Sequence, residues 1–178
     1  MLNDLYLGFG SNLGDRLRNI IAALKMLDRA GVTCKAVSSV YNTKPYGPVE
    51  QSDFLNCVGR FTYEGTPNDI LSEILRIEEI LGRERTIKWG PRTVDIDILL
   101  CDKLVIDTER LGIPHKDIIN RAFVLVPLLE VDPEIKDPRN ERPFFEYLTV
   151  LKGLVIDWPV RVVEASSFAR LTGLEVKE

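Results

Sequence analysis

The chain has 178 residues, 45% of them hydrophobic and 28% charged, which suits one folded domain with a real core and excludes wholesale disorder. Its net charge of −4 disfavours a general nucleic-acid binder or a polybasic protein of the membrane surface. No apolar run approaches the roughly 18 residues that cross a bilayer, and the first residues lack a secretory signal, so we expect a cytoplasmic protein with no membrane or nucleic-acid partner.

Hydrophobic periodicity predicts strands and helices in the first half of the chain. In chain order these are a strand over 5–9, a helix over 17–27, strands over 32–41 and 54–64, and a helix over 66–81. Gly10 ends the first strand, Ser11 and Asn12 supply cap chemistry for the first helix, and Pro67 opens the second. The connection over 42–53 has no periodicity, and connections of that length are often functional.

The second half is predicted to contain further strands and one short helix. Its elements are a strand over 93–101, a turn at 102–103 into a hairpin strand over 104–106, a buried run over 122–131, a proline-punctuated loop over 132–143, a helix over 144–151 and a strand over 160–164. Strands joined both by helices and by a hairpin favour an α+β sandwich over a doubly wound sheet.

The three cysteines, Cys34, Cys57 and Cys101, are widely spaced, and the sequence has no CxxC pair and only one histidine. This pattern argues against a disulfide framework and a structural zinc site, so we expect reduced, buried thiols. Any metal should therefore be a hard cation bound by oxygen ligands.

The stretch KWGPRTVDIDIL over 88–99 carries two acids at alternate positions. On the predicted strand, Asp95 and Asp97 face away from Ile96 and Ile98, because successive side chains alternate. Their backbones are about 7 Å apart, so the carboxylates repel unless a positive charge lies between them. A solvated polar face is the ordinary interpretation. The functional one is a Mg²⁺ clamp, in which a pair of ions could bridge a polyphosphate.

Cations lie on both sides of this acid pair in the sequence. They are Arg83, Arg85, Lys88 and Arg92 upstream, and Arg110, His115, Lys116 and Arg121 downstream. The pattern suits Mg-ATP, because arginines bind phosphate oxygens while carboxylates hold the metal; the alternative is neutralisation of an acidic surface. The glycines over 8–14 are spaced one residue too far apart for a dinucleotide loop, and there is no P-loop. Side chains and metal must therefore bind the phosphates.

A second group of residues suits a flat ring: Thr43, Tyr46, Phe54, Asn56 and Phe123. Phe54 and Asn56 are two apart on a predicted strand and share a face. An aromatic side chain beside an amide can stack a heterocycle and hydrogen-bond its edge, although ordinary core packing is the alternative for both phenylalanines. Trp89 could stack on such a ring or pack internally.

Together these residues resemble the 6-hydroxymethyl-7,8-dihydropterin pyrophosphokinase family. The matching segments, in family order, are GSNLGD at 10–15, VSSVY at 37–41 with Thr43, DFLN at 53–56, GRER at 82–85, WGPRTVDIDIL at 89–99, VIDTERL at 105–111, PH at 114–115 and NRAF at 120–123. The resemblance implies a ferredoxin-like α+β sandwich with a mainly antiparallel central sheet flanked by helices. It also implies that ATP gives its β,γ-pyrophosphoryl group to the pterin's hydroxymethyl oxygen, releasing AMP, in folate biosynthesis.

The resemblance also implies roles for individual residues. Asp95 and Asp97 would bind two Mg²⁺ ions and, with Arg83 and Arg92, form the catalytic group. The ATP-binding residues would be Glu78, Arg83, Arg85, Lys88, Arg92, Ile98, Arg110, His115, Lys116 and Arg121. The pterin-binding residues would be Thr43, Lys44, Tyr46, Phe54, Asn56, Trp89, Asp95 and Phe123. The positions that depart from the family's pattern are Lys44, Tyr46, Lys88, Gly112 and Lys116.

We expect one pyrophosphokinase domain over 1–178, matched to the family over about 1–135, with a variable C-terminal extension over 140–178. We also expect a monomer whose partners are the small molecules ATP and the pterin. Two alternatives stay open. A DxD glycosyltransferase also uses a divalent ion, although this chain is short for one and lacks a nucleotide-binding series of strands and helices. A non-catalytic module of the same fold would bind Mg-ATP but form no AMP, so an assay for AMP separates the alternatives.

Overall fold

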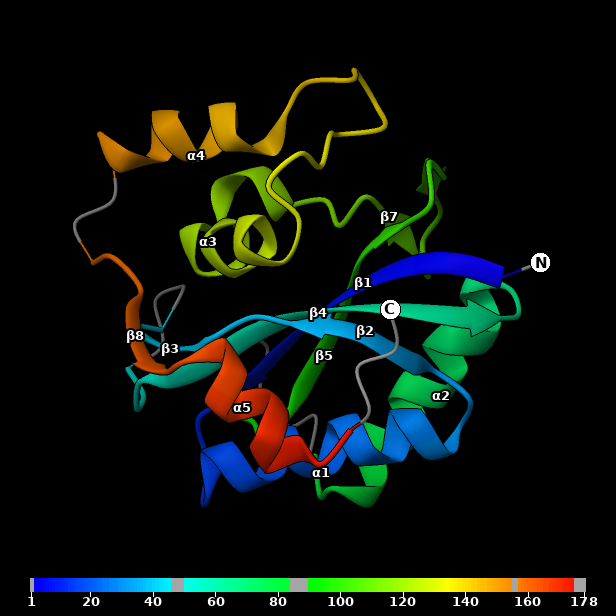
Figure 1. Ribbon diagram of the computed structural model, residues 1–178, viewed down its shortest axis with the longest axis vertical. Helices are drawn as coiled ribbons and strands as arrows, with labels where there is room; N and C mark the ends of the chain where they lie inside the picture. The colour runs from blue at the N-terminus through cyan, green and yellow to red at the C-terminus, as the bar shows by residue number, and fades with distance from the viewer. Residues whose placement is uncertain (1, 46–49, 84–89, 155–156, 175–178) are drawn as a thin grey trace.

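The computed structural model of the chain describes residues 2–45, 50–83, 90–154 and 157–174. Its main feature is a six-stranded sheet in the order β5-β1-β4-β3-β8, in which β2 also pairs with β4 (Figure 1). The strands are β1 (Leu2–Ser11), β2 (Thr33–Val37), β3 (Val40–Thr43), β4 (Phe54–Glu64), β5 (Asp95–Cys101) and β8 (Val160–Val163). The strand pairings of this sheet are antiparallel.

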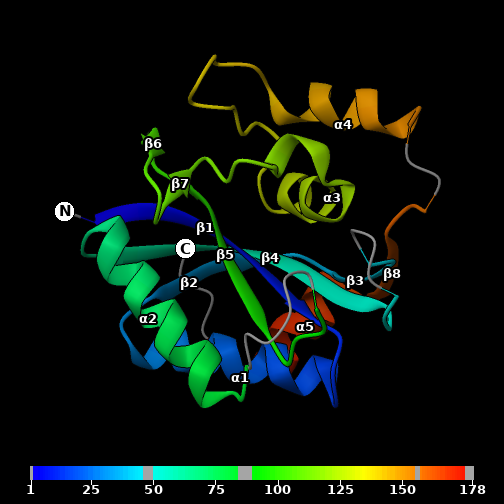
Figure 2. The ribbon, with the colours of Figure 1, turned by 180° about the vertical axis from the view of Figure 1, so that it is seen from behind.

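Helices cover both faces of the sheet. On one face lie α1 (Arg16–Arg29), α2 (Pro67–Ile80) and α5 (Ala165–Thr172); on the other lies α3 (Ala122–Val131), with α4 (Phe144–Lys152) outside it (Figure 1, Figure 2). This arrangement confirms the predicted α+β sandwich with a mainly antiparallel central sheet. In the described part of the chain, no helix is both long and apolar enough to cross a membrane.

The alternating pattern of β1 divides the core into two layers. Leu5, Leu7 and Phe9 are buried in the cluster that contains the apolar faces of α1 and α2. Tyr6 belongs to the second cluster, with residues of α3 and α4. Gly8 and Gly10 lie on the same face as Tyr6 because side chains alternate, and both line a cavity on that face. Because glycine has no side chain, Gly8 and Gly10 leave open space in the cavity.

The predicted single strand over 32–41 is wrong, because it is divided into β2 and β3 at Ser38 and Ser39. Both strands pair with β4. At the break, the Ser38 N–H donates to the Val58 carbonyl at 2.8 Å, and the Val58 N–H donates to Ser38 Oγ at 3.0 Å. The serine side chain thus replaces a ladder hydrogen bond where the strand changes direction, which keeps the buried backbone satisfied.

The predicted hairpin between the strand over 93–101 and residues 104–106 is also wrong. β6 (Ile106–Asp107) pairs with β7 (Gly112–Ile113) and not with β5 (Figure 2). Hydrogen bonds between Thr108 and Leu111 close the turn between them. The Thr108 N–H and hydroxyl both donate to the Leu111 carbonyl, and the Leu111 N–H donates to Thr108 Oγ1, each at 3.0 Å. A side-chain turn of this kind has no Gly or Pro to mark it in the sequence.

Ser11 and Asn12 do not cap α1, contrary to prediction. Asp15 does so, its Oδ1 accepting from the Arg18 N–H at 3.1 Å. Asn12 Oδ1 instead accepts from the Arg92 N–H at 2.7 Å, and Ser11 Oγ donates to the Thr93 carbonyl. These two side chains therefore fasten the approach to β5, where the predicted acid pair lies.

The C-terminal segment is part of the packed structure. β8 pairs with β3 at the edge of the main sheet. The following helix, α5, was not predicted from sequence periodicity and packs on the same face of the sheet as α1 and α2 (Figure 1). Phe168 of α5 is fully buried in the cluster that contains α1 and α2. We therefore propose that the chain folds as one domain to which this segment contributes.

Replacing Phe168 with alanine should lower the free energy of unfolding by about 3–5 kcal/mol, because it removes a buried ring and leaves a cavity. Urea titration followed by circular dichroism would measure this loss. The matched control is Leu171→Ala on the same helix, where the side chain is 52% exposed and little change is expected. Equal midpoints for the two variants would mean that the C-terminal segment does not contribute to the stability of the domain.

Candidate active site

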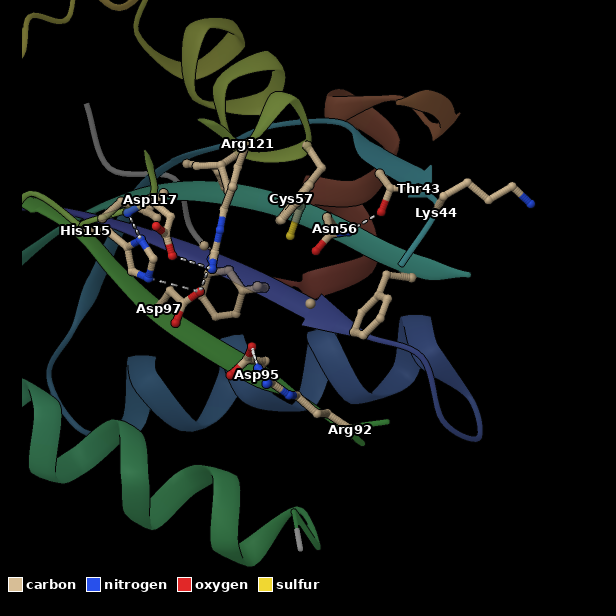
Figure 3. A pocket seen from close by; sticks show the side chains of 18 of the residues that line it. Thr43, Lys44, Asn56, Cys57, Arg92, Asp95, Asp97, His115, Asp117 and Arg121 are labelled. Carbon is tan, nitrogen blue, oxygen red and sulfur yellow. Dashed lines mark hydrogen bonds and ion pairs between the residues drawn. The ribbon is translucent and has the colours of Figure 1, made fainter. Parts of the chain in front are cut away.

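A cavity of about 480 Å³ lies on the α3 side of the sheet. Its walls come from β1, β3, β4 and β5, from the segment after β7, and from the start of α3 (Figure 3). The predicted site residues that line it are Thr43, Lys44, Phe54, Asn56, Arg83, Arg92, Asp95, Asp97, His115, Lys116, Arg121 and Phe123. Residues more than 70 positions apart in the sequence therefore meet in one cavity.

Two further predicted residues line an adjoining hollow. Glu78 and Arg110 face this space of about 300 Å³, which shares Arg83, Arg92, Asp95 and Asp97 with the main cavity. The Ile98 side chain is buried in the core on the other face of the sheet. The predicted residues Tyr46, Arg85, Lys88 and Trp89 lie outside the described residues.

The acid pair lies on one face of β5, as predicted. Asp95 is paired with Gly10 of β1, and Asp97 with Gly8. Residues directly opposite each other on neighbouring strands point to the same face, so each carboxylate has a residue without a side chain beside it. This register leaves open space next to both acids.

Asp95 is held by two arginines. Arg83 Nη1 lies 2.6 Å from Asp95 Oδ1, and Arg92 pairs with the other carboxylate oxygen. Arg83 also pairs with Glu78, whose side chain is buried and accepts a hydrogen bond from the Ile96 N–H at 2.8 Å. Glu78 therefore fixes both Arg83 and the backbone of β5, and Arg83 and Arg92 bring two positive charges to Asp95.

Asp97 lies near Arg121 and His115, at distances of 3.4 Å to Arg121 Nη1 and 4.0 Å to His115 Nε2 (Figure 3). Burial and the neighbouring Asp95 carboxylate raise the pKa of Asp97. The Asp97 side chain is nevertheless about one-third exposed, so it is accessible from the cavity. A positive ion beside it would reverse the shift, because opposite charges favour the ionised acid.

His115 is neutral at pH 7. Burial, helped by the charge of Arg121, lowers the pKa of His115 to about 4. Its Nδ1 accepts a hydrogen bond from the Asp117 N–H at 3.2 Å, so the ring proton of the neutral imidazole is on Nε2, which faces Asp97. His115 can therefore act as a hydrogen-bond donor in the cavity without carrying a charge.

Asp117 is a cavity residue that the sequence analysis missed. Its Oδ2 lies 3.3 Å from Arg121 Nη2, and its backbone orients His115. The spacing of four residues between Asp117 and Arg121 was a signal that could have found it, since such pairs meet on a helical turn. Asp117 holds two predicted phosphate-binding residues in place.

The side of the cavity away from the acid pair is lined by aromatic side chains and by an amide. Asn56 Nδ2 donates to Thr43 Oγ1 at 2.6 Å, and both side chains are buried (Figure 3). Phe54 and Phe123 are only partly buried and line the cavity, and Phe123 also packs against the core cluster that contains residues of α3 and α4. The Lys44 side chain, in contrast, is 60% exposed and pairs with Asp53 at 3.2 Å.

The comparison with protein families gives one match over most of the cavity-forming sequence. The model of the 7,8-dihydro-6-hydroxymethylpterin-pyrophosphokinase (HPPK) family matches residues 6–133. This chain belongs to the HPPK family. The match includes both acids of β5 and the segment from His115 to Phe123, so the predicted family resemblance is confirmed.

Curated relatives named 2-amino-4-hydroxy-6-hydroxymethyldihydropteridine pyrophosphokinase agree with the family match. The Haemophilus influenzae protein is 42% identical over 137 residues, which is 76% of this chain and 86% of the relative. The Bacillus subtilis protein is 41% identical over 137 residues, or 76% and 82% of the two chains. Membership places the chain in a family of pyrophosphoryl-transferring enzymes and decides against the DxD glycosyltransferase.

Solved HPPK structures share the fold. The Plasmodium falciparum HPPK-DHPS structure with pterin and p-hydroxybenzoate superposes with a TM-score of 0.63 and 17% sequence identity, covering 85% of this chain and 42% of that longer chain. A triple mutant of the same protein with STZ-DHP gives a TM-score of 0.67 at 17% identity, over 85% and 43% of the two chains. At this identity the likeness concerns the fold, and it agrees with the predicted mainly antiparallel sheet.

Proposed function

We propose that this HPPK-family chain transfers the pyrophosphoryl group of ATP to the hydroxymethyl oxygen of 6-hydroxymethyl-7,8-dihydropterin, releasing AMP. The observation that carries this assignment is one row across the sheet, in which Asp95, Gly10 and Asn56 are successive partners. Neighbouring strands lie about 4.8 Å apart, so the row separates the acids from the ring-binding side by about 10 Å. A phosphate chain and a flat ring can then meet above Gly10.

The phosphate side of the cavity would be formed by Arg83, Arg92 and Arg121, with His115 as a neutral donor. Arginines recognise phosphate oxygens through two parallel hydrogen bonds, and here they already converge on the two acids. Lys116 also lines the cavity. The adenosine would occupy the adjoining hollow, near Glu78, Arg110 and the backbone at Ile98; Arg85 and Lys88 stay predictions from the resemblance.

The ring side would bind the pterin. Thr43 and Asn56 offer a buried hydroxyl and amide for the polar edge, and the half-buried Phe54 and Phe123 offer faces for stacking. The Arg121 guanidinium lies 5.7 Å from the centre of the Phe123 ring, so one residue borders both sides of the cavity. Lys44, Tyr46 and Trp89 stay predictions for this half of the site.

Asp95 and Asp97 fit a hard divalent cation such as Mg²⁺. Both carboxylates line the cavity, and their mutual repulsion is part of the cause that raises the pKa of Asp97. Among the described residues, no group of three or more His, Cys, Asp or Glu could hold a metal ion, so phosphate oxygens and water would complete the coordination. Two bound Mg²⁺ ions would neutralise the triphosphate and make the pterin hydroxyl more acidic.

The residues of the chain would act mainly by positioning and charge. Arg83 and Arg92 would turn from Asp95 to the phosphate oxygens when ATP binds. The pterin oxygen would attack the β-phosphorus in line, the bond from that phosphorus to the bridging oxygen of the α-phosphate would break, and AMP would leave. The proton of the hydroxymethyl group would pass to a carboxylate oxygen of Asp95, which lies in the same row of the sheet as Asn56.

Asn56→Ala should weaken pterin binding about tenfold, because it removes a buried amide and leaves Thr43 without its hydrogen bond. Calorimetric titration with the pterin, in the presence of a non-hydrolysable Mg-ATP analogue, would measure this effect. Affinity for the ATP analogue alone should stay unchanged. Asn68→Ala, on the exposed start of α2, is the matched control; wild-type pterin affinity in Asn56→Ala would refute the ring-side assignment.

A further inference from the structure

β3 is a short strand whose position matters for the cavity. It has four residues, pairs with β4 at only three positions, and ends at Thr43. Tyr41 is the partner of Asn56 in that pairing, so it continues the row from Asp95 through Gly10 and Asn56. Strands this short need support from neighbouring elements, because few ladder hydrogen bonds hold them.

Glu130, in the last turn of α3, supplies such support. Its carboxylate accepts three hydrogen bonds: from the Ser39 N–H at 2.9 Å, from Ser39 Oγ at 2.7 Å and from the Tyr41 hydroxyl at 2.9 Å. Ser39 and Tyr41 are buried, whereas the glutamate reaches them from the surface. Hydrogen bonds to an ionised acceptor are shorter and stronger than neutral ones, so this junction holds β3 firmly to α3.

The contacts of Glu130 with Ser39 and Tyr41 connect the two elements that carry the proposed ring-binding residues, α3 and β3. α3 begins just after Arg121 and carries Phe123 in its first turn, while β3 carries Thr43 at its end. Phe123 and Glu130 lie on the same helix, seven residues and about 10 Å apart along its axis, with Pro127 between them. Fixing Glu130 on β3 therefore sets the distance between the aromatic side of the cavity and the Thr43–Asn56 pair.

The C-terminal segment meets β3 at the same place. β8 pairs with Val40, Tyr41 and Asn42, and the Arg161 guanidinium lies 5.9 Å from the centre of the Tyr41 ring. The Ala165 N–H, at the start of α5, donates to Ser39 Oγ at 3.0 Å. Ser39 thus links α3, β3 and α5. The segment that lies beyond the family match reinforces the strand on which Thr43 lies.

We propose that Glu130 is a positioning residue for the pterin half of the site. It acts on β3 through Tyr41, which belongs to that strand, and through Ser39, which directly precedes it. This inference rests on the proposed assignment of Thr43 and Asn56 to the pterin. Burial and the Glu130 carboxylate raise the pKa of Tyr41, so its hydroxyl stays protonated and donates to Glu130 at neutral pH. Glu130 itself does not line the cavity, and its effect on the substrate is transmitted by β3.

The test compares Tyr41→Phe with Tyr6→Phe. Both tyrosines are buried, and each donates to a carboxylate at the end of α3: Tyr41 to Glu130, and Tyr6 to Asp132 at 2.7 Å. Only Tyr41 belongs to β3. Tyr41→Phe should raise KM for the pterin about three- to tenfold while KM for ATP and kcat stay within about twofold, as expected for the loss of one hydrogen bond in a binding element. Tyr6→Phe should leave all three constants near wild type.

Glu130→Gln keeps the size of the side chain and should give the same selective rise in KM for the pterin. In the double variant Tyr41→Phe/Glu130→Gln, the free-energy cost of pterin binding should not exceed the sum of the costs in the two single variants. Because Glu130 is exposed, this variant folds even if Tyr41→Phe does not. Thr43→Val and Asn56→Ala separate the possible failures. If they raise KM for the pterin and the Tyr41 and Glu130 variants do not, the positioning role is refuted. If none of the four does, the ring-side assignment is refuted as well.

Discussion

Asp97→Ala should lower the rate of AMP formation by at least about 100-fold. The substitution removes one of the two carboxylates that we propose bind Mg²⁺ beside the phosphates of ATP. The side chain lies at the edge of the cavity and is about a third exposed, so its loss should leave the fold intact. Steady-state assays of AMP at saturating pterin and ATP would measure the change, and the far-ultraviolet circular dichroism spectrum should match wild type.

Asp107→Ala is the matched control for this prediction. Asp107 is an exposed carboxylate on β6 that lines neither the cavity nor the adjoining hollow, so its loss should leave the rate within about twofold of wild type. Activity of Asp97→Ala within about tenfold of wild type would contradict the role of the acid pair.

Arg121→Ala should reduce kcat/KM for ATP by about 30- to 100-fold, since a guanidinium aimed into a phosphate site contributes charge that water does not replace. Arg121 contacts both Asp97 and Asp117, and its side chain is largely buried. Its removal also takes away the guanidinium that pairs with Asp97, which should further raise the pKa of Asp97. Arg121→Lys should restore part of the activity, because it keeps the charge and loses the planar fork.

Arg76→Ala serves as the control for loss of an arginine. Arg76 lies on the outer side of α2, is 55% exposed, and pairs with Glu73. Kinetics with ATP as the varied substrate should show no change beyond about twofold for this variant. If Arg121→Ala and Arg76→Ala behaved alike, Arg121 would not be a phosphate-binding residue.

Sequence patterns predicted much of the fold and of the site because they rest on short-range rules. The alternation over 93–101 correctly placed Asp95 and Asp97 on one face, and the same rule placed Phe54 and Asn56 together. Pro67 correctly marked the start of α2. Family motifs then brought in residues that no local pattern connects, such as His115 and Phe123.

Several of the errors share a physical cause, which is dependence on contacts between distant parts of the chain. The break between β2 and β3 requires the Ser38 hydroxyl to meet Val58, and the carboxylate of Glu130 bonds to Ser39 across 91 positions. α5 owes its place to Phe168, which is buried among residues of the first half of the chain. Periodicity within a window of a dozen residues contains no information about such partners.

Product analysis tests the central claim most directly. The protein would be incubated with ATP, Mg²⁺ and 6-hydroxymethyl-7,8-dihydropterin, and the products would be identified by phosphorus NMR and mass spectrometry. Pyrophosphoryl transfer predicts AMP and the pterin diphosphate in equal amounts, with both formed at least about 100-fold more slowly when Asp97→Ala replaces the wild type. Formation of ADP with a pterin monophosphate, or binding of both substrates without any AMP, would contradict the account.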